Sequence, residues 1–137
     1  MNPRRGNESV FHLKAKTAIG GLFNASDWSV FYEQQDADVL VMHDATRFIA
    51  AIEVESSPRN VRRNLMRDTT NGCSAVAVVA LNTSYLPRIT DMAVNHAMAH
   101  PDTGVMVFPH DSGGMQALHG WLTAIACCKQ AKTENLP

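Results

Sequence analysis

The chain has 137 residues, of which 45% are hydrophobic and 18% are charged, and its formal net charge at pH 7 is −1. This length suits one domain over residues 1–137 that buries a core without disulfides. The near-neutral charge excludes a polycation that binds nucleic acid through bulk charge, so such binding would need a local patch. The sequence shows neither a membrane span nor a signal peptide. We expect a cytoplasmic protein whose three cysteines are free thiols.

The first half of the chain predicts a helix followed by three strands. Apolar residues recur at helical spacing over residues 8–23, where Ser9 is a candidate N-cap. Aromatic and β-branched residues then indicate strands at about 28–34, 37–43 and 47–55. The segment "HDAT" is expected to form a tight hairpin turn between the last two strands.

The second half of the chain alternates helices with short apolar strands. Ser57 followed by Pro58 predicts the start of a helix that ends at Gly72. "SAVAVVAL" indicates a buried central strand, followed by a helix over 86–99, a strand over 104–109 and a final helix over 111–132. The order α-β-β-β-α-β-α-β-α predicts an α/β fold with a mixed central sheet flanked by helices.

Acidic residues interrupt the apolar strand "FIAAIEVE". Side chains alternate along a strand, so Glu53 and Glu55 point to the same face. Across the predicted hairpin, Asp38 falls about opposite residues 51 to 53, so three carboxylates converge at one end of the ladder. A register slip of one residue would send Asp38 to the other face, and Asp36 is then the alternative.

The three carboxylates have two interpretations. They are either solvated at a strand end and paired with Arg59 or Arg62, or they bind a divalent cation that removes their mutual repulsion. Oxygen ligands of this kind suit Mg²⁺ or Mn²⁺. Such an ion placed against a phosphodiester would activate a water for hydrolysis.

The element order and the acids together resemble the PD-(D/E)XK nuclease-like superfamily, whose fold is called restriction-endonuclease-like. Its α-β-β-β-α-β core carries an acid on the second strand and (D/E)-x-K on the third. Here "QDADVLVM" supplies Asp38 and "FIAAIEVESS" supplies Glu53. The resemblance implies that Asp38, Glu53 and the carbonyl of Val54 bind Mg²⁺ or Mn²⁺. Glu55 stands where the family usually has lysine.

The resemblance implies two alternative functions, because some members of the superfamily with an E-x-E motif cleave DNA and others have lost the activity. In the first, the protein is a metal-dependent endonuclease that hydrolyses DNA phosphodiester bonds, with Asp38, Glu53 and Glu55 as catalytic residues. In the second, a catalytically inactive nuclease-like fold acts as a nucleic-acid-binding or protein-assembly subunit, in a homodimer or a larger complex.

The helix that follows the acidic strand is basic. Arg59, Arg63 and Arg67 are four residues apart and are expected along one face, while Val61, Leu65 and Met66 face the sheet. Guanidinium groups form bidentate hydrogen bonds with phosphate oxygens, so this face predicts phosphate contacts without base specificity. An ordinary solvated basic face is the alternative. The predicted nucleic-acid contacts are Arg59, Asn60, Arg63, Asn64, Arg67 and Lys14.

Three of the six histidines have positions that suggest a role. His96 and His100 are four residues apart on a predicted helix, a spacing that can chelate zinc, but an incidental surface pair is the favoured interpretation. His12 lies on the first helix, whose exposed face is expected to look toward the acidic site, where it would contact substrate.

Overall fold

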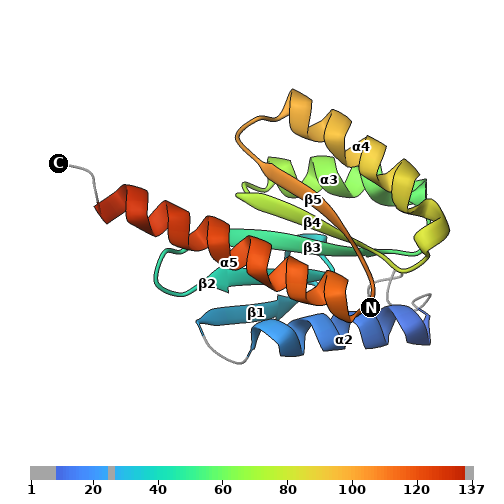
Figure 1. The fold of residues 1–137 in the computed structure, drawn as a ribbon, viewed down its shortest axis with the longest axis horizontal. Helices are drawn as coiled ribbons and strands as arrows, with labels where there is room; N and C mark the ends of the chain where they lie inside the picture. Colours follow the sequence, from blue (N-terminus) through green and yellow to red (C-terminus); the bar gives the residue numbers. More distant parts are fainter. Residues whose placement is uncertain (1–8, 25–26, 135–137) are drawn as a thin grey trace.

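The computed structural model describes residues 9–24 and 27–134, with side chains as far as Cys128. Five strands form one sheet in the order β1-β2-β3-β4-β5. β1 and β2 pair antiparallel, as do β2 and β3, whereas β3, β4 and β5 run parallel. The strands are β1 (Trp28–Tyr32), β2 (Val39–His43), β3 (Ile49–Glu55), β4 (Ala75–Ala80) and β5 (Gly104–Pro109). The predicted α/β fold with a mixed sheet is therefore confirmed (Figure 1).

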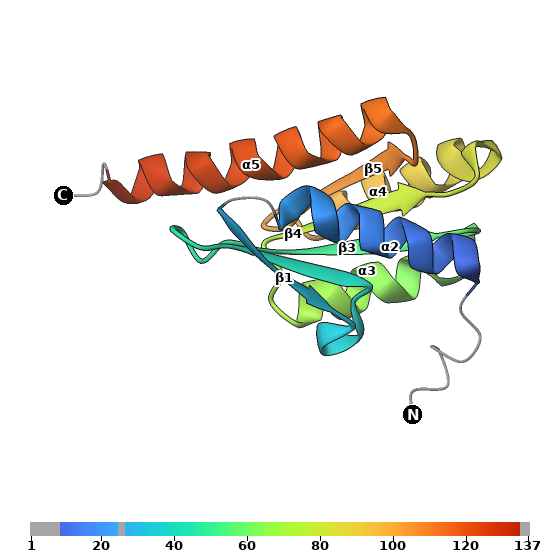
Figure 2. The same cartoon turned by 90° about the horizontal axis from the view of Figure 1, so that it is seen from below.

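In the described part of the chain, four α-helices cover the two faces of the sheet. They are α2 (Val10–Phe23), α3 (Val61–Thr70), α4 (Leu86–Ala99) and α5 (Ser112–Glu134). One core cluster joins α2 and α5 to the sheet through Ile19, Phe23 and Leu118, and a second joins α3 and α4 through Leu65 and Ile89. Figure 2 shows α2 and α5 on one side of the sheet and α3 on the other. No helix among the described residues is long and apolar enough to cross a membrane.

The hairpin between β2 and β3 sets the register of the acidic strand. The turn closes with a hydrogen bond from Arg47 N to His43 O (2.8 Å), as "HDAT" predicts. Val39 pairs with Ile52, so Asp38, one residue before β2, lies beside Glu53. The predicted placement of Asp38 opposite residues 51 to 53 is confirmed. Asp38 is fully buried and Asp36 is exposed, which decides between the two aspartates.

The segment between β1 and β2 differs from the prediction. Strands were expected at about 28–34 and 37–43, but β1 ends at Tyr32 and a short 3₁₀ turn covers Gln34–Asp36. Glu33, Gln35 and Asp36 all have positive φ, between 55° and 65°. Left-handed backbone is incompatible with a strand, so the chain turns here and brings Glu33 back toward α2.

The crossover after β3 follows the sequence signals. Ser57 caps a 3₁₀ turn over Pro58–Asn60, which leads directly into α3. Gly72 follows the helix with a φ of 88°, the left-handed conformation that glycine adopts without a Cβ clash. Met66 is 47% exposed, however, so the prediction that it faces the sheet is wrong. It lies about 100° around the helix from the buried Leu65.

Candidate functional site

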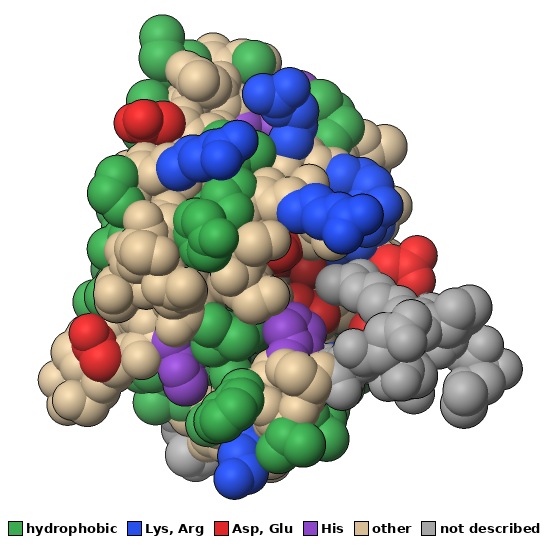
Figure 3. All heavy atoms as spheres, turned by 90° about the vertical axis from the view of Figure 1, so that its right-hand side faces the viewer, with side chains coloured by type: hydrophobic (Ala, Val, Ile, Leu, Met, Phe, Trp, Pro, Cys, Tyr) green, Lys and Arg blue, Asp and Glu red, His purple; other side chains and the backbone are tan. Residues whose placement is uncertain are grey.

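The candidate site lies at the edge of the sheet where β3, β4 and β5 end. The N-terminal ends of α2, α3, α4 and α5 lie at the same edge (Figure 1), so four sets of helix N–H groups and positive dipole ends face it. Figure 3 looks onto this edge. Acidic atoms are recessed in its middle, most of the Lys and Arg side chains lie on one side of them, and histidine side chains and several hydrophobic side chains lie on the other.

A cleft of about 530 Å³ opens at this edge between α2, the end of β3 and the start of α3. Its walls are mostly polar and carry groups of both charges. Arg59 and Arg63 contribute two guanidinium groups, opposite the carboxyl groups of Glu33 and Glu55. The lining residues are Ser9, His12, Glu33, Val54, Glu55, Ser56, Arg59, Asn60, Arg63 and Asn64.

Asp38 accepts a backbone hydrogen bond at the point where the antiparallel pairing of β2 with β3 ends. The last pair is Val39 with Ile52, and Asp38 Oδ2 then accepts a hydrogen bond from Val54 N (2.8 Å). On the other side of the same residue, His12 Nε2 lies 2.7 Å from Val54 O and 3.6 Å from Asp38 Oδ2. A carbonyl only accepts, so Nε2 carries the proton. Asp38 and His12 thus hold both backbone groups of Val54, as buried backbone requires.

Glu53 is fully buried and interacts with α3. Arg67 Nη2 donates to Glu53 Oε2 at 2.6 Å and to Asp68 Oδ1 at 3.1 Å. Burial raises the pKa of Glu53 well above its ordinary value, and a hydrogen bond with Asp68 and the charges of Asp68 and Asp38 raise it further, against the opposing effect of Arg67. Glu53, Asp68 and Arg67 therefore form a buried cluster with one guanidinium between two carboxyl groups.

Glu55 lies at the floor of the cleft and is tied to the same cluster. Asn64 Nδ2 donates to Glu55 Oε1 at 2.6 Å, and Asn64 Oδ1 accepts from Arg67 Nη1 at 2.9 Å. Asn64 therefore bridges Glu55 to the guanidinium that holds Glu53. Both glutamates interact with α3, which confirms that they share one face of the sheet.

A buried lysine that sequence reasoning missed lies behind the cleft. Lys16 on α2 pairs with Glu33, and both side chains are almost completely buried. Its position carries a signal that could have found it, because His12, Lys16, Ile19 and Phe23 recur at helical spacing and place Lys16 on the buried face of α2. A lysine there needs an acidic partner, since an unpaired buried charge is costly.

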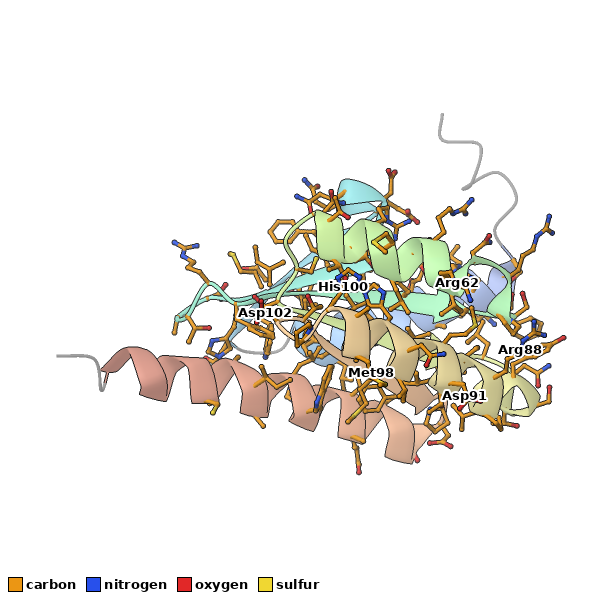
Figure 4. The ribbon with its side chains drawn as sticks, turned by 90° about the horizontal axis from the view of Figure 1, so that it is seen from above. Arg62, Arg88, Asp91, Met98, His100 and Asp102 are labelled. Atoms are coloured by element: carbon orange, nitrogen blue, oxygen red, sulfur yellow. The ribbon has the colours of Figure 1, made fainter. Side chains whose placement is uncertain are left out.

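Arginines extend from the cleft into a second groove of about 480 Å³ between α3 and α4. Arg59 lines both cavities, and Arg62, Arg88 and Tyr85 line only the second groove. Figure 4 shows Arg62 on α3 and Arg88 on α4 at the same end of the molecule. Four arginines therefore border one continuous surface, which we call the arginine track: Arg59, Arg62, Arg63 and Arg88.

Two predicted nucleic-acid contacts lie outside the cleft and the second groove. Arg67 turns inward to Glu53, with 21% of its side chain exposed. Lys14 lines a separate apolar pocket on the α2 side. Arg59, Asn60, Arg63 and Asn64 line the cleft as a group, although the amide of Asn64 is already bonded to Glu55 and Arg67.

Each of the three groups that the resemblance implies for Mg²⁺ or Mn²⁺ has a protein partner at one of its oxygens. Asp38 accepts a hydrogen bond from Val54 N–H, Glu53 accepts one from Arg67, and the Val54 carbonyl accepts one from His12. Among the residues that the structure describes, no group of three or more His, Cys, Asp or Glu side chains is placed to hold a metal ion. The donors suit these hard cations by type, but they do not fit one in this arrangement.

The pair of histidines on α4 is engaged in packing. The rings of His96 and His100 stack with centroids 4.3 Å apart, and His96 Nε2 lies 2.8 Å from Thr69 Oγ1 on α3. Burial lowers the pKa of His96, and the neighbouring His100 lowers it further. The pair is therefore not the surface pair that the sequence predicted, because His96 is buried and joins α4 to α3.

Comparison of the chain with protein-family models, with curated proteins and with solved structures gives no match.

The raised pKa of Glu53 predicts a pH dependence of stability. A carboxyl group whose folded pKa exceeds its unfolded value, near 4.5, contributes stability below that value and loses it as the pH rises through the folded pKa. Glu53→Gln mimics the protonated acid, so the variant should lose less stability than the parent between pH 4.5 and neutral pH. Chemical denaturation across this range tests the prediction, with the exposed Asp91→Asn as control. Parallel curves for parent and Glu53→Gln would contradict it.

Proposed function

We propose that the protein is a nuclease-like domain that binds a nucleic-acid strand, most simply DNA, along the cleft and the arginine track without hydrolysing it. One observation carries the proposal: the cleft and the second groove share Arg59 and form a continuous surface bordered by four arginines. A continuous row of cations suits a polyanion better than a small anion, because it meets successive phosphates.

The fold supports a nuclease-like assignment. A helix, an antiparallel meander of three strands, a crossover helix and a parallel fourth strand follow one another in that order, which is the core that the resemblance implies. Asp38, one residue before β2, lies beside Glu53 of the adjacent strand β3 at the end of that meander. These features are the ones on which the superfamily resemblance depends.

The hydrogen bonds and the burial of the acidic residues favour binding over hydrolysis. Arg67 is hydrogen-bonded to Glu53, and Asn64 is hydrogen-bonded to Glu55. Asp38 and Glu53 are fully buried and do not line the cleft. The acids that the motif requires are thus occupied within the protein, whereas Arg59 and Arg63 line the open cleft.

A metal-dependent endonuclease of the PD-(D/E)XK kind is the second candidate. The observation in its favour is that Asp38 lies near enough for its charge to raise the pKa of Glu53, so two motif acids converge. Hydrolysis would require Arg67 to leave Glu53. Incubation of supercoiled DNA with the protein and Mn²⁺ or Mg²⁺ tests it, with Glu53→Ala as control. Cleavage by the parent and not by the variant would establish this function instead.

The binding proposal predicts a salt-dependent affinity for single-stranded DNA. Each phosphate contact contributes about −0.7 to the slope of log K against log salt for a single strand. Four arginines therefore predict a slope of roughly −3. Fluorescence anisotropy of a labelled short oligothymidylate at several salt concentrations measures it. A slope near zero, or no binding at low salt, would reject the proposal.

A further inference from the structure

An apolar pocket of about 690 Å³ lies beside the cleft, on the α2 side. Residues that follow three parallel strands form its far wall: Ser56 after β3, Leu81 and Asn82 after β4, and His110 after β5. α2 forms the near wall. The lining residues are Ser9, Phe11, Lys14, Ala15, Ala18, Ser56, Leu81, Asn82 and His110.

The pocket adjoins the cleft. Ser9 and Ser56 line both cavities, so the pocket and the cleft are direct neighbours on either side of these two residues. Figure 3 shows recessed acids between the main group of Lys and Arg side chains and an area with histidine and hydrophobic side chains, which has a further Lys or Arg side chain at its far end. The arginine track and the apolar pocket thus lie at opposite ends of one path.

The chemistry of the pocket combines an aromatic ring with polar groups. Phe11 is 78% exposed, although it belongs to a helix whose opposite face is buried. Asn82 Oδ1 accepts hydrogen bonds from Ser84 N (3.0 Å) and Ser84 Oγ (2.7 Å), which fixes the side chain and leaves its NH₂ group as the donor side. A flat apolar surface beside hydrogen-bonding groups matches a nucleobase, which has a π-face and a polar edge.

We propose that this pocket receives an unpaired nucleobase of the strand whose phosphates lie in the cleft, with the base stacked on the ring of Phe11. The inference depends on the proposed function and adds to it that the ligand is single-stranded where it passes α2. Base stacking on an aromatic ring is tolerant of sequence, so this pocket favours an unpaired base without selecting one base.

Two probes of equal charge distinguish binding of a base from binding of the phosphates. One is a short oligothymidylate, and the other is an abasic oligomer of the same length with the same number of phosphates. The parent should bind the oligothymidylate more tightly than the abasic oligomer. Phe11→Ala should weaken binding of the oligothymidylate by about tenfold, as expected for removal of one stacked base, and should leave binding of the abasic oligomer unchanged. Phe11→Tyr should keep the parent affinity.

Met98→Ala is the matched control, because Met98 is 77% exposed and lies on α4, away from the end that carries Arg62 and Arg88 (Figure 4). It should bind both probes as the parent does. Equal affinity of the parent for both probes, or no effect of Phe11→Ala, would overturn the proposal that the pocket binds a base. It would not affect the proposal that the cleft binds phosphates. Failure of both probes to bind would overturn the proposed function as well. A change of oligomeric state in Phe11→Ala with unchanged oligothymidylate binding would show a protein interface instead.

Discussion

Replacement of Arg67 by alanine is expected to lower the free energy of unfolding by about 3–5 kcal/mol, the usual cost of removing one partner from a buried ion pair. Arg67 is the guanidinium between the buried carboxyl groups of Glu53 and Asp68, and it also donates to Asn64. Its removal leaves these carboxyl groups without their cation in a site where ionisation is already unfavourable. Chemical denaturation of the variant and the parent at neutral pH measures the difference.

The pH dependence of this loss of stability shows whether it comes from uncompensated charge or from lost packing contacts. Protonation of the carboxyl groups at lower pH removes the uncompensated charge, so the gap between parent and Arg67→Ala should narrow as the pH falls. Arg67→Lys should be intermediate, because an ammonium keeps the charge but cannot form the bidentate fork. Arg62→Ala, an exposed arginine on the same helix, should have little effect. A gap that stays constant with pH would contradict the proposed role of Arg67.

Removal of Arg59 and Arg63 together should abolish most of the affinity for single-stranded DNA. Both are exposed on the cleft wall, and a charge-assisted hydrogen bond to phosphate is worth on the order of tenfold in affinity for each arginine. The salt slope should also fall by about 1.4 in magnitude, because each phosphate that is no longer neutralised accounts for about 0.7. Fluorescence anisotropy at several salt concentrations gives both quantities for Arg59→Ala/Arg63→Ala.

A charge control distinguishes a local interaction from a change in net charge. Arg47→Ala removes an exposed arginine at the β2–β3 hairpin, which is the opposite edge of the sheet from the cleft. It should change the affinity far less than either single variant, Arg59→Ala or Arg63→Ala. Equal decreases in affinity for all three would show that bulk charge, and not the cleft, determines binding. Thermal unfolding should be unchanged in each variant, because exposed arginines contribute little to stability.

The sequence was sufficient to predict the order of elements and, to within one residue, the register of the acidic strand. Local chemistry determines both: "HDAT" closes a hairpin, and the apolar run of β3 alternates with period two. Because the turn fixes the pairing, Asp38 falls beside Glu53 without any tertiary information. The helix after β3 was equally predictable from Ser57, Pro58 and Gly72, which are start and stop residues.

The hydrogen-bond partners of the acidic residues were not predictable, because they depend on the angle at which each side chain leaves the axis of α3. A step of four residues advances about 40° beyond a full turn, so Arg67 lies roughly 80° around the helix from Arg59. The 3₁₀ turn over Pro58–Asn60 changes the phase again. Together these rotations move Arg67 off the exposed face and onto Glu53. The sequence pattern therefore predicted three arginines at the phosphates where the structure places two in the cleft.

The left-handed residues before β2 were also beyond sequence reasoning. Glu33, Gln35 and Asp36 adopt positive φ without being glycine, a conformation that costs energy for such residues and depends on tertiary support. The pairing of Glu33 with Lys16 on α2 supplies part of that support. A buried ion pair between elements so far apart in the chain leaves only a weak trace in the sequence, namely a lysine on the apolar face of a helix.

The central claim is that the cleft binds a nucleic-acid strand through its arginines while the neighbouring acids are neutralised within the fold. The most direct test is the affinity of the protein for a labelled single-stranded oligonucleotide, measured once with EDTA and once with Mn²⁺, followed by electrophoresis of the oligonucleotide. We predict that Mn²⁺ does not strengthen binding, since added cations compete with the arginines for the phosphates, and that the oligonucleotide is intact after incubation. Binding that requires Mn²⁺, or cleavage in its presence, would contradict the claim.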